Sequence, residues 1–416
     1  MKLKKSETNN AIVTILANVR KHPNADRLKL ATVLGTQVIV GLEAKDGDVV
    51  VYFDSNLRLS HEYLHYNNQY SNPEMNADTS VKGYFPKTGR VKCQRFRGEV
   101  SNGYVADLSS LTSIGLVKYN CDTLPITELK VGDEFTHIND VEICSKYLAE
   151  KSGGVQCGAG KKKKSRVSTN MFWKMWDTKH LMREMHRIVP GTLYVEEKIH
   201  GTSGRTANAL YRRKRRWFQF WKPKVTSFWK VVSGTRRVDG TYGHMGKERR
   251  EIHEKLAPHV RKGEELYYEI YGYHRSGRHV QKGFIYGCED REYKVMLYRV
   301  TITTEDGYRI DLDREQVYRR AEELVLEKPV LLDIFLETEH TKWDDPAEIT
   351  KDRCDMIAEL ANGQSALDPD TLREGIVVWF KDCSGNWTCL KHKSEEFLML
   401  DSRNKDKGIG DVEDEL

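Results

Sequence analysis

An alternating stretch in the middle of the chain, residues 193–203 (LYVEEKIHGTS), predicts a β-strand that ends in a turn of small residues. Side chains alternate between the two faces of a strand, so Lys198 shares a face with Glu196 and His200. Gly201 would let a ligand come close to the backbone. A lysine in this setting is either a solvated edge residue or a nucleophile, and the rest of the sequence has to decide between the two.

Length and composition bound the class of protein. The chain has 416 residues, enough for two or three domains, and a formal net charge of +6. Its eight cysteines include no CxxC pair, so they are expected to be free thiols in a reducing compartment. No stretch approaches the ~20 apolar residues of a membrane span. We therefore expect a cytoplasmic, monomeric protein that does not bind membranes.

Residues 1–150 are expected to form a β-rich module. Short strand-like runs lie between turn signals there, a spacing typical of a small barrel. The segment 58–90 is polar and rich in Tyr and Asn, which predicts a long loop or an insertion. Small barrels bind nucleic-acid strands by stacking and phosphate contacts, and ordinary surface charges are the alternative interpretation of the basic residues here. The basic candidates are Arg90, Lys92, Arg95 and Arg97.

Three further segments organise the chain. Residues 151–170 contain Gly, Ser and Lys without apolar periodicity, so we predict a flexible linker. Residues 171–189 have apolar side chains at helical spacing and are predicted to form one helix that packs in a core. Residues 401–416 are polar and acidic and predict a mobile tail.

The segment 211–230 (YRRKRRWFQFWKPKVTSFWK) interleaves basic and aromatic residues. We predict an exposed hairpin near the mouth of the site. Direct contact with a nucleic-acid strand, through residues such as Arg212 and Arg213, is one interpretation. A long hairpin without that role and a nuclear-targeting-like run are the others.

Charged residues recur in or just after predicted strands, where burying a charge is costly. Each of them alone could belong to a structural ion pair. Together they would supply a nucleophilic amine, cations for phosphate groups and carboxylates for a divalent metal. They are Lys198 with Gly201, Arg236, Glu269, Glu374, and the pair Lys391 and Lys393.

In order and type, these residues resemble the motifs of the covalent nucleotidyltransferase superfamily, which contains polynucleotide ligases and mRNA capping enzymes. KIHG (198–201) is similar to the nucleophile motif KxxG, and EIYG (269–272) is similar to the third motif. EGIVV (374–378) resembles the fourth motif, LKHK (390–393) the fifth, and YRV (298–300) the motif between the third and the fourth. One KxxG is a weak signal, but five motifs in order are a specific one.

Two features resemble the RNA-ligase branch of that superfamily. His200 makes the first motif KxHG with a following Thr, whereas DNA ligases and capping enzymes usually have KxDG. Residues 22–35 and 95–104 resemble the N-terminal module of the oligonucleotide-binding (OB) type found in one group of RNA ligases. DNA ligases and capping enzymes usually place an OB domain after the core, where this chain has only a short tail after Lys393. The long 211–230 segment departs from the family pattern.

The resemblance implies an α+β fold, with an OB-like β-barrel in 1–150 and, in 171–400, a nucleotidyltransferase core of antiparallel sheets flanked by helices. It implies an ATP-dependent RNA ligase that joins a 3′-OH to a 5′-phosphate through a lysyl-AMP, in RNA repair. The RNA would be a nicked duplex, broken ends or an RNA/DNA hybrid. The alternatives are a DNA ligase, a capping-type guanylyltransferase, and an RNA-binding protein that has lost catalysis.

The resemblance also implies roles for single residues. Lys198 is the nucleophile, which has to be neutral to attack, and neighbouring cations favour the neutral amine. Lys391 and Lys393 hold the α-phosphate, while Glu374 and Glu269 hold Mg²⁺ or Mn²⁺, with the ribose as a second possibility for Glu269. The other nucleotide-binding candidates are Glu197 for the adenine amino group, Ile199, Gly201, Arg236 (or Arg237 or Arg205) for the ribose or phosphate, and Tyr298 for base stacking or the core.

Overall fold

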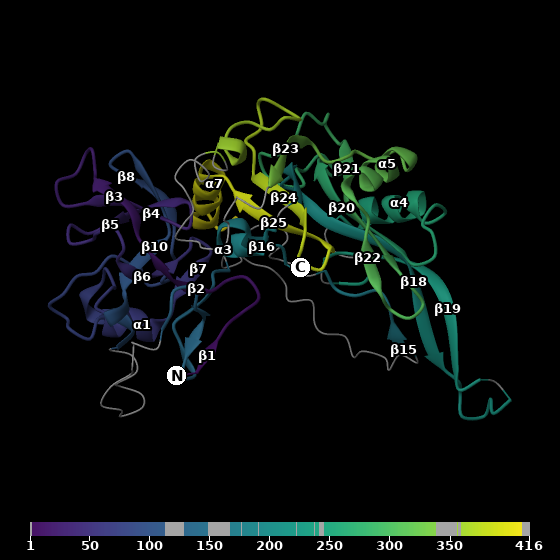
Figure 1. The fold of residues 1–416 in the computed structure, drawn as a ribbon, viewed down its shortest axis with the longest axis horizontal. Coiled ribbons are helices and arrows are strands. Elements are labelled where there is room, and N and C mark those ends of the chain that lie inside the picture. The colour runs from purple at the N-terminus through teal and green to yellow at the C-terminus, as the bar shows by residue number, and fades with distance from the viewer. Residues whose placement is uncertain are drawn as a thin grey trace.

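The chain is a mixed α+β protein with mostly antiparallel sheets, as the sequence predicts. Figure 1 shows the N-terminal strands, purple to blue, beside a larger core, teal to yellow. The computed structural model describes residues 2–112, 129–148, 167–175, 177–189, 191–221, 223–236, 238–240, 245–337, 356 and 359–409.

The N-terminal part is built from short antiparallel strands. In the described residues they pair in the orders β1-β12-β13, β10-β6-β2-β11, β14-β7, β3-β4-β5 and β8-β9. The strands are β1 (Leu3–Lys4), β2 (Ala11–Ile15), β3 (Ala17–Lys21), β4 (Lys29–Val33), β5 (Thr36–Val40), β6 (Val49–Phe53), β7 (Leu57–Leu59), β8 (Cys93–Phe96), β9 (Glu99–Asn102), β10 (Tyr104–Asp107), β11 (Glu134–Phe135), β12 (His137–Ile138), β13 (Val141–Glu142) and β14 (Cys144–Lys146).

These strands do not form the single closed barrel that the sequence predicts, within the ranges described. The sheet that contains β2 and β6 is covered on both faces by apolar clusters. In β2, Val13 packs in one cluster and Ile12 in the other, because neighbouring side chains point to opposite faces. A sheet buried on both faces acts as a central layer. Strand periodicity alone does not reveal how short strands divide among sheets.

The segment 58–90 is more ordered than a long loop. It contains the helix α1 (His61–Tyr66) and the 3₁₀ turn η1 (Pro73–Met75). The Ser60 side chain accepts a hydrogen bond from the backbone of Tyr63 at the start of α1, and Tyr63 is fully buried. The prediction of a loop is therefore wrong for part of this segment, because one short amphipathic turn is difficult to see among polar residues.

The core contains two larger sheets, with strand orders β15-β18-β20-β21-β22, where β19 also pairs with β18, and β16-β25-β24-β17-β23. Among these strands only β16 and β25 pair in parallel. The strands are β15 (Val167–Asn170), β16 (Lys179–His180), β17 (Gly191–Lys198), β18 (Thr202–Lys214), β19 (Val225–Gly234), β20 (Glu264–Gly272), β21 (Tyr293–Thr303), β22 (Arg309–Asp311), β23 (Leu331–Glu337), β24 (Gly375–Lys381) and β25 (Trp387–Lys393). The predicted linker 151–170 overlaps β15, so its last four residues belong to a strand of the core. Residues 151–166 lie outside the described part.

Helices flank the sheets. α4 and α5 pack on the first core sheet through one apolar cluster that includes Leu256, Leu266 and Val317 (Figure 1). None of the described helices is long and apolar enough to cross a membrane. The remaining helices and turns are η2 (Leu108–Leu111), α3 (Leu181–Glu184), η4 (Met185–Arg187), α4 (Gly246–Leu256), α5 (Arg314–Glu323) and α7 (Glu395–Asp406).

The prediction of one helix over 171–189 is wrong. In the described part of this segment, helical structure is confined to α3 and η4, and β16 precedes them. Phe172 packs on Ala207 and Ala209 of β18, whereas Met182 and Met185 pack against the second sheet. The apolar residues therefore serve two different cores, and their helical spacing does not report one helix.

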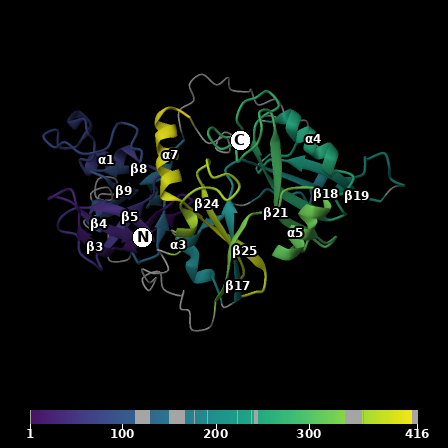
Figure 2. The same cartoon turned by 90° about the horizontal axis from the view of Figure 1, so that it is seen from above.

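Helix α7 connects the N-terminal part to the core (Figure 2). The Arg90 side chain is 2% exposed and donates hydrogen bonds to Asp406 (2.8 Å) and to the carbonyl of Ser402 (3.0 Å). Lys92 pairs with Asp406 as well. Two predictions are corrected here. Arg90 is a buried interdomain contact and is not a surface cation, and residues 401–406 belong to a helix and not to a mobile tail.

Candidate functional site

Lys198 is the last residue of β17, which lies between β23 and β24 in the second core sheet. The register pairs Lys198 with Gly375 of β24. Leu193 and Val195 of the same strand are buried in the core of this sheet. Because its strand is paired and packed in this way, the backbone of Lys198 has a defined position.

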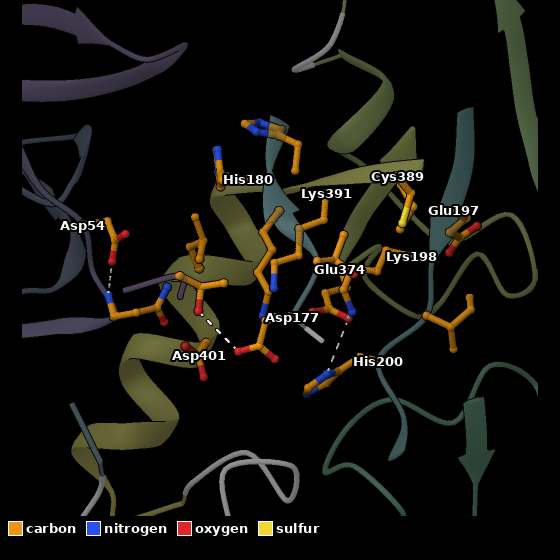
Figure 3. A pocket seen from close by; sticks show the side chains of 18 of the residues that line it. Asp54, Asp177, His180, Glu197, Lys198, His200, Glu374, Cys389, Lys391 and Asp401 are labelled. Atoms are coloured by element: carbon orange, nitrogen blue, oxygen red, sulfur yellow. Dashed lines mark hydrogen bonds and ion pairs between the residues drawn. The ribbon is translucent and has the colours of Figure 1, made fainter. Parts of the chain in front are cut away.

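A single buried carboxylate lies at the centre of the site. Glu374 is 1% exposed, and its Oε2 accepts a hydrogen bond from the Lys198 ammonium at 2.7 Å. The Lys393 ammonium lies 2.9 Å from Oε1, and His200 Nδ1 lies 3.6 Å from Oε2. Figure 3 shows Lys198, Glu374 and His200 pointing toward one another. Glu374 therefore bridges the two lysines.

The bridge keeps Glu374 ionised. Burial alone would raise its pKa, but the cations Lys198 and Lys393, together with His200, outweigh burial and hold the pKa of Glu374 well below its usual range. The ion pair also holds Lys198 in place. The Lys198 amine has to leave this carboxylate and lose a proton before it can act as a nucleophile.

Lys391 lies on the same face of β25 as Lys393 and lines the same cavity as Lys198. Among the residues that the structure describes, no carboxylate lies within ion-pair distance of Lys391. Burial, followed by the neighbouring cations Lys393 and Lys198, lowers the pKa of Lys391 to about 8. Lys198, Lys391 and Lys393 thus line one part of the cavity, where Glu374 pairs with only two of them, and this part is suited to an anionic ligand.

The turn after Lys198 is held by Glu269 of β20. Its Oε1 accepts a hydrogen bond from Gly201 N at 3.1 Å, and its Oε2 accepts one from Ser203 Oγ at 3.0 Å. A Cβ atom on Gly201 would lie 2.3 Å from the carbonyl oxygen of Ile270. Only glycine lets the turn approach β20 this closely.

Gly201→Ala is expected to lower the free energy of unfolding by ~1–3 kcal/mol, because the new methyl group overlaps the backbone of β20. Gly41 is the matched control, since a Cβ there meets nothing within 4 Å. Gly41→Ala should change stability by less than ~0.5 kcal/mol. Chemical denaturation of both variants measures the difference, and equal stability of the two would contradict the close approach at Gly201.

Glu197 lies beside the lysine with its side chain buried. Its Oε2 accepts a hydrogen bond from Ala366 N at 2.8 Å. Its Oε1 is buried and has no hydrogen-bond partner among the described residues, although Glu197 lines the cavity. A buried acceptor without a donor is costly, so this atom is suited to an N–H group of a ligand.

The other residues predicted for the nucleotide site differ in the contacts that hold their side chains. Arg236 forms an ion pair with Asp177 at 2.6 Å, and the Tyr298 hydroxyl contacts the sulfur of Met175 at 3.3 Å. Arg205, an alternative to Arg236, is 0% exposed and pairs with Asp239, so it has a structural role. Arg237, the second alternative, lies outside the described residues.

One cavity of about 290 Å³ brings together the predicted nucleotide-site residues. The predicted RNA-contacting residues are not among those that line it. The cavity is lined by Glu197, Lys198, Ile199, Gly201, Arg236, Glu269, Tyr298, Glu374, Lys391 and Lys393. The RNA-contact candidates outside it are Arg90, Lys92, Arg95, Arg97, Arg212 and Arg213.

The cavity also includes residues that the sequence did not indicate. Asp54 and Asn102 from the N-terminal part line it, and so do Asp177 and Asp401. Figure 3 shows Asp54 and Asp401 on the side of the pocket opposite Glu197. Asp54 is held by Arg183 of α3 at 3.0 Å, a contact between residues 129 positions apart. No local pattern predicts such a contact.

The two carboxylates predicted to hold a metal do not form a complete site by themselves. Glu374 is bound to two lysines, and Glu269 holds the turn. No group of three or more potential ligands is present among the described residues. Carboxylate oxygens do suit Mg²⁺ and Mn²⁺, and Mg²⁺ is commonly held by one or two carboxylates together with substrate phosphates. The residues thus fit a metal ion that arrives with phosphate groups.

No protein-family model matches the chain, and no curated protein matches it significantly. Solved structures of the RNA ligase of Naegleria gruberi are similar over nearly the whole length. A lysine-to-alanine variant with ATP and Mn is 17% identical with a TM-score of 0.56, covering 94% of this chain and 98% of that chain. An aspartate-to-alanine variant in its apo form is 16% identical with a TM-score of 0.58, and the match covers 96% of this chain and 99% of that chain. The ligase with PPi is 17% identical with a TM-score of 0.56, and the match covers 95% of this chain and 98% of that chain. This likeness shows a shared fold, a mixed α+β architecture with several antiparallel sheets.

Proposed function

We propose that the chain is an ATP-dependent RNA ligase that joins a 3′-OH to a 5′-phosphate through a lysyl-AMP on Lys198. The observation that supports this most is the cluster of Lys198, Lys391 and Lys393 at the cavity, above all Lys391, which has no carboxylate within ion-pair distance in the part of the chain that the structure describes. The ligase of the same fold, which has been solved with ATP and with PPi, supports ATP as the nucleotide.

In the first step, the Lys198 amine attacks the α-phosphorus of ATP. A phosphorus–nitrogen bond forms, and the bond to pyrophosphate breaks. An incoming triphosphate competes with Glu374 for Lys198 and Lys393, which loosens the ion pair and frees the Lys198 side chain to reach the α-phosphorus, with the proton of the attacking amine passing to solvent. Lys391 and Lys393 then stabilise the charge that develops on the α-phosphate, because both project from the same face of β25.

Glu197 accounts for the choice of base. Its unpartnered Oε1 is an acceptor, and the amino group at position 6 of adenine is a donor. Guanine has a carbonyl oxygen at this position, which would set an acceptor against an acceptor. We therefore propose that Glu197 selects ATP over GTP, with Tyr298 and Ile199 lining the nucleotide cavity.

In the later steps, AMP moves from Lys198 to the 5′-phosphate of RNA, and a 3′-OH attacks that phosphate and expels AMP. Arg236 would contact the ribose or the 5′-phosphate after releasing Asp177. Glu269, already fixed by Gly201 and Ser203, would contact the ribose. A Mg²⁺ or Mn²⁺ ion bound with the phosphates, with Glu374 as the protein ligand, would supply further positive charge.

The N-terminal part is proposed to be an OB-like module that binds RNA. Arg95 and Arg97 are exposed and support this role. His200 supports the branch with KxHG. Its ring lies edge-on to Phe284 at 4.7 Å and its Nδ1 lies 3.6 Å from Glu374 Oε2, which supports a positioning role. Action as a monomer, in the cytoplasm and in RNA repair stays a prediction.

The lowered pKa of Lys391 makes the first step sensitive to alkaline pH. Lys391 has to be protonated to hold the α-phosphate, so kcat/KM for lysyl-AMP formation should fall as the pH rises through about 8. A lysine of ordinary pKa would keep its charge to about 10.4. Lys391→Arg should move the fall to higher pH, because a guanidinium stays protonated. An identical pH profile in this variant would assign the fall to a different group.

The proposal is tested with α-labelled ATP or GTP, a divalent metal and nicked substrates. ATP labelling of the protein, followed by sealing of nicked RNA but not of an all-DNA duplex, is the expected result. Labelling by GTP would indicate a capping enzyme, and sealing of all-DNA nicks would indicate a DNA ligase. No label from either nucleotide would leave an RNA-binding protein without catalysis.

A further inference from the structure

The strands β18 and β19 extend beyond the body of the molecule as a long hairpin, whose strand β18 also pairs with β15 at residues 211–213 (Figure 1). β20 pairs with β18 only over residues 202–207, whereas the pairing of β18 with β19 continues to Lys214 and Val225. β18 begins directly after Gly201, so the hairpin starts beside the site. Twelve steps along β18 at ~3.3 Å each put the tip ~40 Å from that turn.

The tip of this hairpin exposes large aromatic side chains. Trp217 is 91% exposed, Phe220 is 76% exposed and Trp221 is 66% exposed. Two edge-on ring pairs form there, Trp217 with Phe218 and Phe220 with Trp221. Leaving rings of this size in water is costly, and exposed apolar surface concentrated at one place marks an interaction site.

The hairpin is also strongly basic. Residues 211–230 contain eight Lys and Arg residues and no Asp or Glu. Arg216 and Lys224 are exposed at the tip, and Arg212, Lys214 and Lys230 are exposed along the two strands. The positive charge therefore extends from the tip back toward the body, where the cavity lies.

We propose that the hairpin tip binds an unpaired segment of the RNA substrate, ~40 Å from the end that is sealed. Bases would stack on Trp217, Phe220 and Trp221, and the basic residues would contact phosphates. This inference rests on the proposed RNA-ligase function. Interleaved aromatic and basic side chains are how proteins bind single-stranded nucleic acid without sequence preference.

The distribution of charge favours RNA over a lipid surface. Aromatic and basic residues together also suit an anionic bilayer, but a bilayer would meet the tip alone. Here the basic residues continue along both strands, through Lys214 on β18 and Lys230 on β19. The register places Lys214 and Lys230 on opposite faces of the hairpin, so an extended polyanion that passes around the hairpin toward the site would contact both.

The test compares a nicked RNA duplex that has a single-stranded extension with the same duplex lacking it, by fluorescence anisotropy on the full chain. The variant Trp217→Ala/Phe220→Ala/Trp221→Ala should bind the extended RNA at least ~10-fold more weakly. Its binding of the blunt duplex and its rate of lysyl-AMP formation should match those of the unmodified protein. Because the three side chains are exposed, their substitution should not disturb the fold, and thermal unfolding of the variant checks this.

A matched variant separates stacking from general apolar contact. Leucine at the three positions keeps apolar bulk without aromatic faces, so it should behave as alanine does, whereas Trp217→Phe/Trp221→Phe should keep most of the affinity. Unchanged binding of extended RNA by the alanine variant would overturn the proposal. Full binding of extended RNA by the leucine variant would overturn it as well. So would an alanine variant that loses binding to vesicles of anionic phospholipid but keeps its binding of extended RNA. Failure of the ligase proposal would be seen separately, as no lysyl-AMP in the unmodified protein.

Discussion

Lys198→Ala is expected to lower ATP-dependent labelling of the protein at least ~10³-fold, because the amine that would form the bond to phosphorus is gone. Lys393 and Lys391 have different positions, since Lys393 holds the opposite oxygen of Glu374 and Lys391 lies two residues before it on β25. The measurement is transfer of label from α-labelled ATP to the protein.

Lys198→Arg is the control for structure. Arginine retains a cation for Glu374 but stays protonated, so it should restore stability without restoring labelling. RNA that already carries AMP on its 5′-phosphate bypasses the missing amine. Both Lys198 variants should therefore still seal such RNA, and a loss of this sealing equal to the loss of labelling would show that the substitution damages the site as a whole.

Lys391→Met is expected to slow lysyl-AMP formation ~10²–10³-fold, because it removes a cation aimed at the developing charge on the α-phosphate. The same substitution should raise the free energy of unfolding. The pKa of Lys391 is lowered to about 8 in the folded protein, whereas it is ~10.4 in the unfolded chain, so the protonated side chain destabilises the fold below pH 8. Methionine removes this penalty, and the gain should shrink as the pH rises toward ~10.4.

Lys381→Met is the matched control, since Lys381 is an exposed lysine at the end of the neighbouring strand β24. It should leave both the rate and the stability nearly unchanged. Rates of label transfer and denaturation curves for the two variants decide the question. If Lys391→Met lost activity and stability together, the role of Lys391 would be structural.

The strands and the site lysines were predictable because their signals are local. Alternation over 193–203 and 387–393 indicates strands, and the same alternation is enough to place Lys391 and Lys393 on one face. Glu374 was predictable only as a motif residue. Its place between two ammonium groups depends on the pairing of β17, β24 and β25, which the sequence pattern does not contain.

Contacts distant in the sequence account for what the sequence could not predict. Arg90 reads as a surface charge beside a strand, yet it is buried against Asp406, 316 residues away. Asp54 lines the cavity, and its carboxylate is paired there with Arg183, 129 residues away. A hairpin at 211–230 was predicted and is present, but the predicted place near the mouth of the site is wrong, because the tip lies ~40 Å from it. The length of the hairpin beyond β20 depends on tertiary pairing, which is not a local signal.

The most direct test is to locate the nucleotide on the protein after incubation with ATP and a divalent metal, by mass spectrometry of its peptides. This measurement distinguishes Lys198 from Lys391, whose pKa is lowered to about 8 and whose amine lines the same cavity. We expect one AMP per chain, attached to Lys198 through its side-chain nitrogen. AMP attached to Lys391 or Lys393 instead, or no attached AMP at all, would contradict it.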